Sequence, residues 1–139
     1  MASTYRLGPV RDRRARVEQG SKHALADAVS EARATAAEVE VAAARVATVR
    51  ARLAIAAPPS AGAAARTLAD RYLARRRREL AEARVEEARA RASHVGRLDA
   101  IDSSRGALAA ARADKEVIER HFARWREQQR KLAEARREE

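Results

Sequence analysis

The chain has 139 residues, of which 37 are alanine and only 23 are Leu, Ile, Val or Phe, and its formal net charge is +10. So little large apolar surface cannot build a globular core several layers thick, which leaves disorder or long helices. The absence of cysteine excludes a disulfide framework and a thiolate nucleophile. No apolar run is long enough for a membrane span, and none follows the N-terminus, so we expect a cytoplasmic protein without membrane insertion.

Prolines and glycines divide the chain into two helical segments. Gly8-Pro9 can open a helix, because proline in the first turn loses no needed hydrogen bond. The run from Pro58 to Gly62 contains two prolines and is the one clear loop. We therefore predict a helix over about 9–57, a loop at 58–62 and a second helix over about 63–138. The glycines, Asp and Ser of 96–106 are typical of helix ends, so a hinge there is an alternative to a continuous helix.

Both helical segments carry apolar and small residues at spacings of three and four, as in the seam of a coiled coil. The first segment has Leu25, Val29, Ala32, Ala36, Val39, Ala43, Val46, Arg50 and Leu53, joined upstream through a stutter by Val10, Arg14, Val17 and Ser21. The second segment has Leu73, Leu80, Ala83, Ala90 and Val95, followed by Leu108, Ala111, Lys115, Ile118, Phe122, Trp125, Gln129 and Leu132. Two seams joined by one tight loop predict an all-α fold, an antiparallel two-helix coiled-coil hairpin that forms a single domain over 1–139.

The position of the loop predicts the register of the hairpin. A turn centred near residue 60 places Val46 near Leu73 and Val39 near Leu80. Leu25 then lies near Val95, so that large seam residues meet one another. In this register the first helix is used up near residue 112, and the longer C-terminal arm is left unpaired. That arm carries Ile118, Phe122, Trp125 and Leu132 on one stripe, which is typical of an interface.

No group of residues points to catalysis. A two-helix hairpin offers no concave pocket, the three histidines are far apart in sequence, and no glycine-rich phosphate loop occurs. We therefore predict no enzymatic activity, no cofactor and no metal site. The densest charge is the run Arg75 to Arg78, which either covers the seam with its aliphatic stems or docks on an acidic protein. Tyr72 and Leu73, directly before it, are either core near the loop or a partner contact.

Three segments of the chain carry a resemblance to a known family. They are Tyr5-Arg6-Leu7-Gly8-Pro9-Val10 with the basic residues up to Arg14, Thr67-Leu68-Ala69-Asp70-Arg71-Tyr72-Leu73, and the run from Ala107 to His121. Together they resemble the FliJ/YscO (SctO) family of type III secretion stalk proteins, over nearly the whole chain. The resemblance implies a basic helical hairpin at the inner-membrane export apparatus. Its two chain ends would insert into the hexameric export ATPase, and the segment after the loop would contact the export gate; members also bind export chaperones.

Two sets of site residues follow by position from this resemblance. The candidates for ATPase contact are Val10, Arg13, Arg14, Ile118, Phe122, Trp125 and Leu132. The candidates for contact with the export gate are Tyr72 and Leu73, and the charge run adds Arg75, Arg76, Arg77 and Arg78 as candidates for contact with the gate or another, acidic partner. Arg76 departs from the family, which tends to continue an apolar stripe at that point. The resemblance does not separate a flagellar from an injectisome member.

Two other functions fit the residues. A helical protein with this positive charge could bind nucleic acid, although no aromatic side chains interleave with the arginines to stack on bases. A self-assembling structural coiled coil, in which the C-terminal stripe pairs with itself, is the second alternative.

Overall fold

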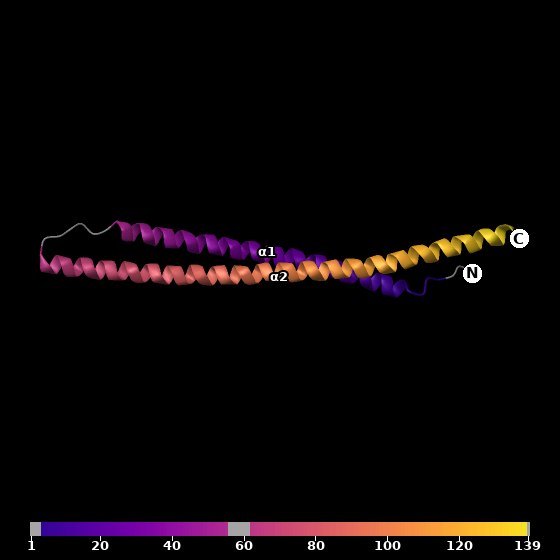
Figure 1. Ribbon diagram of the computed structural model, residues 1–139, viewed down its shortest axis with the longest axis horizontal. Helices are drawn as coiled ribbons and strands as arrows, with labels where there is room; N and C mark the ends of the chain where they lie inside the picture. Colours follow the sequence, from indigo (N-terminus) through magenta and orange to yellow (C-terminus); the bar gives the residue numbers. More distant parts are fainter. Residues whose placement is uncertain (1–3, 56–61, 139) are drawn as a thin grey trace. The chain divides into compact units, whose positions relative to one another are not determined.

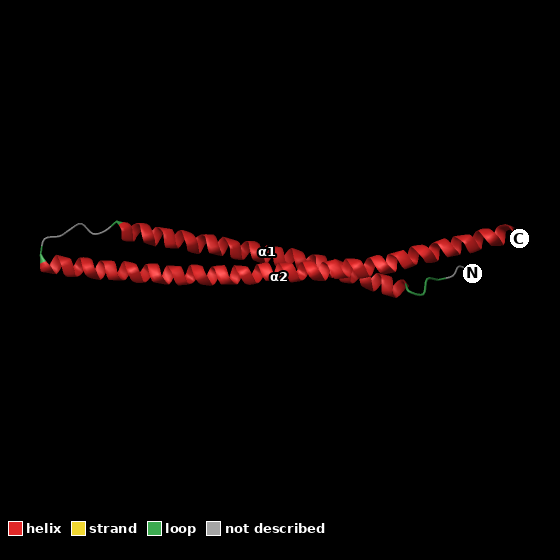
Figure 2. Cartoon of the chain, viewed as in Figure 1, coloured by secondary structure: helices red, strands yellow, loops and turns green. Residues whose placement is uncertain are grey.

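The computed structural model describes residues 4–55 and 62–138. In these ranges the chain is all-helical and contains two helices, α1 (Gly8–Ala54) and α2 (Ala63–Glu138). The helices pack against each other as a hairpin, and α2 is the longer one (Figure 1). Colouring by secondary structure shows helix and short loop segments only over the described residues (Figure 2). The predicted helical hairpin is confirmed, whereas most of the predicted loop at 58–62 lies outside the described residues.

Local chemistry explains where the helices begin. The first turn of α1 forms around Pro9, where Gly8 N donates to the carbonyl of Tyr5 at 3.2 Å. At the other end α1 ends at Ala54, and Ile55 N donates to the carbonyl of Ala51 at 3.2 Å. The predicted end near residue 57 lies outside the described residues. Gly62 precedes α2 with a φ of 113°, a conformation that favours glycine because a Cβ would be strained there.

The hinge at 96–106, considered as an alternative to a continuous helix, does not interrupt α2. α2 is helical through the whole of 96–106, including Gly96 and Gly106. The Asp and Ser residues of this stretch therefore do not act as caps in the structure. An isolated glycine costs an α-helix only about 1 kcal/mol, which long neighbouring segments of good helix formers offset.

The chain forms two compact units, each made of one stretch from either helix. The terminal unit comprises residues 1–28 and 100–139, and the loop unit comprises residues 29–99. The core of the loop unit is a cluster in which Val46 and Val49 of α1 pack with Leu80 and Ala83 of α2. Leu53 packs against this cluster from the side. Because Ala83 is fully buried and small, the two helices approach closely at this point.

The contacts of the loop unit show that the predicted register is wrong by about ten residues. Val46 belongs to one cluster with Leu80 and Ala83 and does not pair with Leu73 as predicted. Thr35 Oγ1 lies 2.9 Å from His94 Nδ1, a contact that the predicted register does not allow. The first turns of α2 consequently reach past the end of α1, as Figure 1 shows.

A regular heptad accounts for the observed register. One set of buried and half-buried positions follows the three-four spacing without a stutter on both helices, apart from the exposed Arg97 on α2, and further half-buried residues such as Val29, Ala36 and Ala43 lie beside this set. On α1 the members of the set are Arg11, Arg14, Glu18, Ser21, Leu25, Ala28, Ala32, Thr35, Val39, Ala42, Val46, Val49 and Leu53. On α2 they are Ala69, Leu73, Arg76, Leu80, Ala83, Glu87, Ala90, His94, Ile101, Ser104, Leu108, Ala111, Lys115, Ile118, Phe122, Trp125 and Gln129. Unbroken heptads let two helices supercoil evenly, whereas a stutter unwinds the pair locally.

The unbroken heptad places some polar residues in the seam between the two helices and leaves some valines outside the seam. Glu18 and Thr35 are buried, while Val17 is 52% exposed and Val95 is 56% exposed. Both valines, like Arg50, were predicted to lie in the seam, and those predictions are wrong. Apolar character alone selected them, because the sequence does not show which polar side chains find a partner on the other helix.

Candidate functional site

The terminal unit contains a cross-helix charge cluster around Glu18. Lys115 Nζ donates to Glu18 Oε2 at 2.7 Å, and Lys22 and Arg112 lie 3.3 and 3.7 Å from Oε1 of the same carboxylate. The hydrogen bond from Lys115, and more weakly the one from Lys22, holds the pKa of Glu18 below its ordinary value. Three cations around one buried carboxylate keep it satisfied, so a charged residue can occupy the seam where an apolar one was predicted.

An aromatic cluster forms where the segment before α1 meets α2. Tyr5 packs on Phe122 and Trp125, with ring centroids 4.9 and 5.2 Å away, and the last two rings stack at 5.8 Å. Tyr5 Oη is at hydrogen-bond distance, 2.9 Å, from His121 Nδ1. Three of the four aromatic residues of the chain thus gather in one place. We call Tyr5, Phe122 and Trp125 the aromatic cluster.

Arg11 links α1 to the part of α2 that carries the aromatic cluster. Its guanidinium lies 4.1 Å from the centre of the Phe122 ring, and its Nε donates to Glu119 Oε1 at 2.7 Å. The hydrogen bond raises the pKa of Arg11 and lowers the pKa of Glu119. The cation, the ring and the carboxylate therefore support one another.

The predicted unpaired arm is much shorter than expected. Ile118 is buried, with 4% of its surface exposed, and Phe122 and Trp125 are half-buried beside Tyr5 and Arg11. Only Leu132 of the predicted stripe is exposed, at 52%. The expectation that all four residues form an open apolar face was wrong, because the register is displaced and residues before α1 also pack on α2.

The N-terminal candidates for ATPase contact line an open hollow. Val10, Arg13 and Arg14 of α1 border a space of about 330 Å³ together with Ala111 and Asp114 of α2. Arg14 Nη1 donates to the main-chain carbonyl of Asp114 at 2.8 Å, whereas Arg13 is exposed. The structure therefore brings these residues together, with the apolar side chains of Val10 and Ala111 in the lining and the exposed positive charge of Arg13 at its edge.

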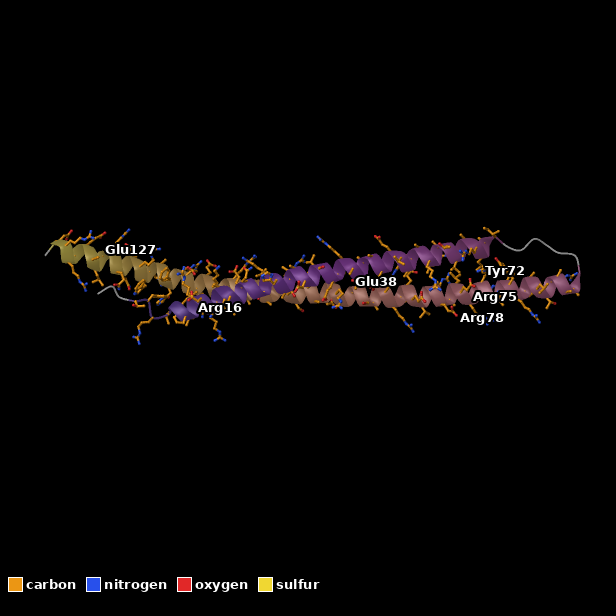
Figure 3. The ribbon with its side chains drawn as sticks, turned by 180° about the vertical axis from the view of Figure 1, so that it is seen from behind. Arg16, Glu38, Tyr72, Arg75, Arg78 and Glu127 are labelled. Atoms are coloured by element: carbon orange, nitrogen blue, oxygen red, sulfur yellow. The ribbon has the colours of Figure 1, made fainter. Side chains whose placement is uncertain are left out.

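The gate candidates divide into two groups in the loop unit. Tyr72, Leu73 and Arg76 are half-buried, and the Arg76 guanidinium lies 4.9 Å from the centre of the Tyr72 ring. Arg76 Nη1 also donates to Glu79 Oε2 at 2.7 Å, while its buried Nε has no hydrogen-bond partner among the described residues. The other arginines are exposed: they are Arg75, Arg77 and Arg78. Figure 3 labels Tyr72, Arg75 and Arg78 on the stretch of α2 that follows the loop.

Sequence reasoning missed two residues of the terminal unit. Tyr5 and Arg11 were quoted only as part of the family resemblance, yet they make the contacts that cover the aromatic face. The usable signal was rarity: aromatic side chains bury large areas and pair favourably, so each of the four aromatic residues of the chain is a candidate for packing on another. The pairing itself depends on the register and therefore required the structure.

Neither a metal-binding group of side chains nor a membrane-spanning helix occurs among the described residues. No three side chains of His, Asp or Glu in residues 4–55 and 62–138 are placed to hold a metal ion. Neither of the two described helices has the long apolar stretch that a membrane crossing needs. Comparison with protein-family models, curated proteins and solved structures found no match to the chain.

Proposed function

We propose that the chain is a non-enzymatic stalk or adaptor of a type III protein export apparatus. Its ends bind the hexameric export ATPase, and the part near the loop faces the export gate and export chaperones. The contact of Tyr5 with Phe122 and Trp125 is the observation that carries this proposal. It holds the N-terminal family-like segment against the part of α2 that directly follows the other one, and Tyr5 also contacts His121, the last residue of that second segment.

The charge of the C-terminal part of α2 suits an acidic pore. From Arg120 to Arg137 the chain has seven basic residues against two acidic ones. Beyond the aromatic cluster α2 is largely exposed, so most of this charge is available to a partner. Positive charge on a narrow helical element is attracted by the electrostatic field of a negatively lined channel.

Only some of the candidates for ATPase contact have side chains that a partner can reach. Ile118 is closed off, and Trp125 is partly covered by Tyr5. The accessible part of the predicted site consists of Leu132, Val10 and Arg13. We therefore assign the contact to these three exposed residues and give the aromatic cluster the role of holding the two chain ends together.

The proposal is tested by binding of the purified chain to a purified hexameric type III export ATPase, measured by biolayer interferometry. Leu132→Glu should weaken binding at least tenfold, because burying a leucine side chain contributes about 1.5–3 kcal/mol. Val85→Glu is the matched control, since Val85 is 50% exposed but lies in the loop unit. We expect the control to bind within about twofold of the unmodified chain.

Two results would contradict the proposal. One is the absence of binding to the ATPase, or equal binding by the chain with and without Leu132→Glu. The other is tight binding to duplex DNA or RNA that needs no protein partner and falls steeply with salt, which would favour the nucleic-acid alternative.

A further inference from the structure

A second apolar face runs along α1 in the loop unit, on the side away from the seam. Its members recur at spacings of three and four, and every one of them is uncharged and exposed. They are Ala34, Ala37, Val41, Ala44, Thr48, Ala51 and Ile55. Ile55 at 76% and Val41 at 71% are the most exposed large hydrophobic side chains among the described residues. We call this set the outer face of α1.

The outer face has the geometry of an unused coiled-coil seam. Spacings of three and four place side chains on one helix stripe, which fits the groove of another helix better than a flat surface. α2 covers the opposite side of α1, where Val46 and Val49 are buried. An apolar stripe of this length left in water is typical of an interaction surface.

The charges along one edge of the outer face identify the occupant. Glu31, Glu38, Arg45 and Arg52 follow one another at seven-residue intervals, two acids before two bases. Consider two copies of this face that pair in antiparallel orientation, so that Val41 of one copy packs on Ala44 of the other. Glu38 of one copy then lies opposite Arg45 of the other. The same alignment places Glu31 opposite Arg52, and the two-fold axis repeats both pairs. In a parallel pairing this edge would face the opposite edge of the second copy, where Arg33 and Glu40 pair only with Glu38 and Arg45, so the antiparallel alignment alone gives all four charges a partner.

The contacts within one chain leave these charges available. Arg45 pairs with Glu86, and Glu31 pairs with Arg97, but both pairs lie at the surface with about half of each side chain exposed. A guanidinium has five N–H donors and a carboxylate has several acceptor sites, so each can hold a second partner. Glu38, labelled on α1 in Figure 3, borders a shallow hollow with Ala37, Val41 and Arg45. This hollow gives room for the long charged side chains of a second copy.

We propose that the outer face of α1 binds the same face of a second copy of this chain, antiparallel and with two-fold symmetry. The interface lies in the loop unit and shares none of the residues assigned to the ATPase contact. It is also distinct from self-pairing of the C-terminal stripe, because Ile118, Phe122 and Trp125 are already covered within the chain.

Analytical ultracentrifugation of the full chain over a range of concentrations tests for the dimer. The unmodified chain should show a reversible monomer–dimer equilibrium, and Val41→Glu should weaken it at least tenfold by burying two carboxylates in the interface. Leu132→Glu is the control, since it makes the same change at an exposed residue of the terminal unit. A chain that stays monomeric, or a dimer that Val41→Glu leaves intact, overturns the proposal.

Disulfide trapping tests the orientation of the two copies. The chain contains no cysteine, so introduced thiols report without background. Mixing an Ala34→Cys chain with a tagged Ala51→Cys chain should give the mixed disulfide, because the antiparallel register brings these positions together. Disulfides between identical chains, which a parallel pairing would form, overturn the proposal.

A charge exchange tests the edge pairing. Glu38→Arg alone creates two like-charge contacts and should weaken the dimer about tenfold. Adding Arg45→Glu in the same chain restores opposite charges across the axis and should recover most of the affinity. Circular dichroism of each variant checks that the hairpin itself is intact. A double variant that dimerises no better than Glu38→Arg contradicts the assigned register.

Discussion

Removal of the Tyr5 ring should uncover the single tryptophan of the chain. Tyr5 contacts both Phe122 and Trp125, with ring centroids 4.9 and 5.2 Å away. Each aromatic pair contributes about 0.5–1.5 kcal/mol beyond the burial of its surface, so Tyr5→Ala should weaken docking of the N-terminal segment by about 1–3 kcal/mol. That range corresponds to at least a fivefold shift toward the undocked state.

Fluorescence quenching by acrylamide measures this change, because Trp125 is the only tryptophan. Tyr5→Ala should increase the quenching constant and shift the emission to longer wavelength. Tyr5→Phe should stay close to the unmodified chain, since it keeps the ring and loses only the exposed contact with His121. Tyr72→Ala is the matched control, because Tyr72 lies in the other unit.

Two outcomes would refute this reasoning. If Tyr5→Ala leaves the quenching of Trp125 unchanged, the N-terminal segment does not cover the tryptophan in solution. If Tyr5→Phe has as large an effect as Tyr5→Ala, the polar contact with His121 and not ring packing holds the segment.

Three further predictions concern register and stability. Cysteines at positions 46 and 83 should cross-link within one molecule, whereas cysteines at 46 and 73 should not; the reverse result would restore the register predicted from the loop. Leu80→Ala should lower the free energy of unfolding, measured by urea denaturation, by about 2–3 kcal/mol because Leu80 is buried in the cluster with Val46 and Ala83. The pKa of Glu18 is lowered in the folded state, so its stabilising contribution is complete above about pH 4.5 and is lost as the pH falls below that value. Glu18→Gln should therefore lower Tm at neutral pH and flatten its acid dependence, and an unchanged pH profile would contradict the assignment.

Much of the fold follows from composition and spacing. A chain rich in alanine and arginine, with Pro9 and the paired prolines near residue 58 as punctuation, has few alternatives to two long helices. The three-four spacing also identified most seam residues correctly, including Val39, Val46 and Leu108. These features are local, since each depends on neighbours within a turn or two of the same helix.

The site was only partly predictable. Phe122 and Trp125 were singled out because they lie on the apolar stripe of the arm that was predicted to be unpaired, and the structure places them together with Tyr5. Their exposure was predicted wrongly, because it depends on what the other end of the chain covers. Leu132 and Arg13 remain exposed as a partner contact requires.

The sequence by itself determined the helices, their amphipathic sides and the hairpin, because helix propensity and periodicity act over short distances. Only the tertiary structure decided the register, since alanine-rich seams slide past one another at little cost and the apolar pattern permits several alignments. The choice rests on specific cross-helix partners: Lys115 satisfies Glu18, His94 meets Thr35, and Tyr5 closes over Trp125. Such pairs bring together residues up to about 120 positions apart, and no local pattern in the sequence encodes that distance.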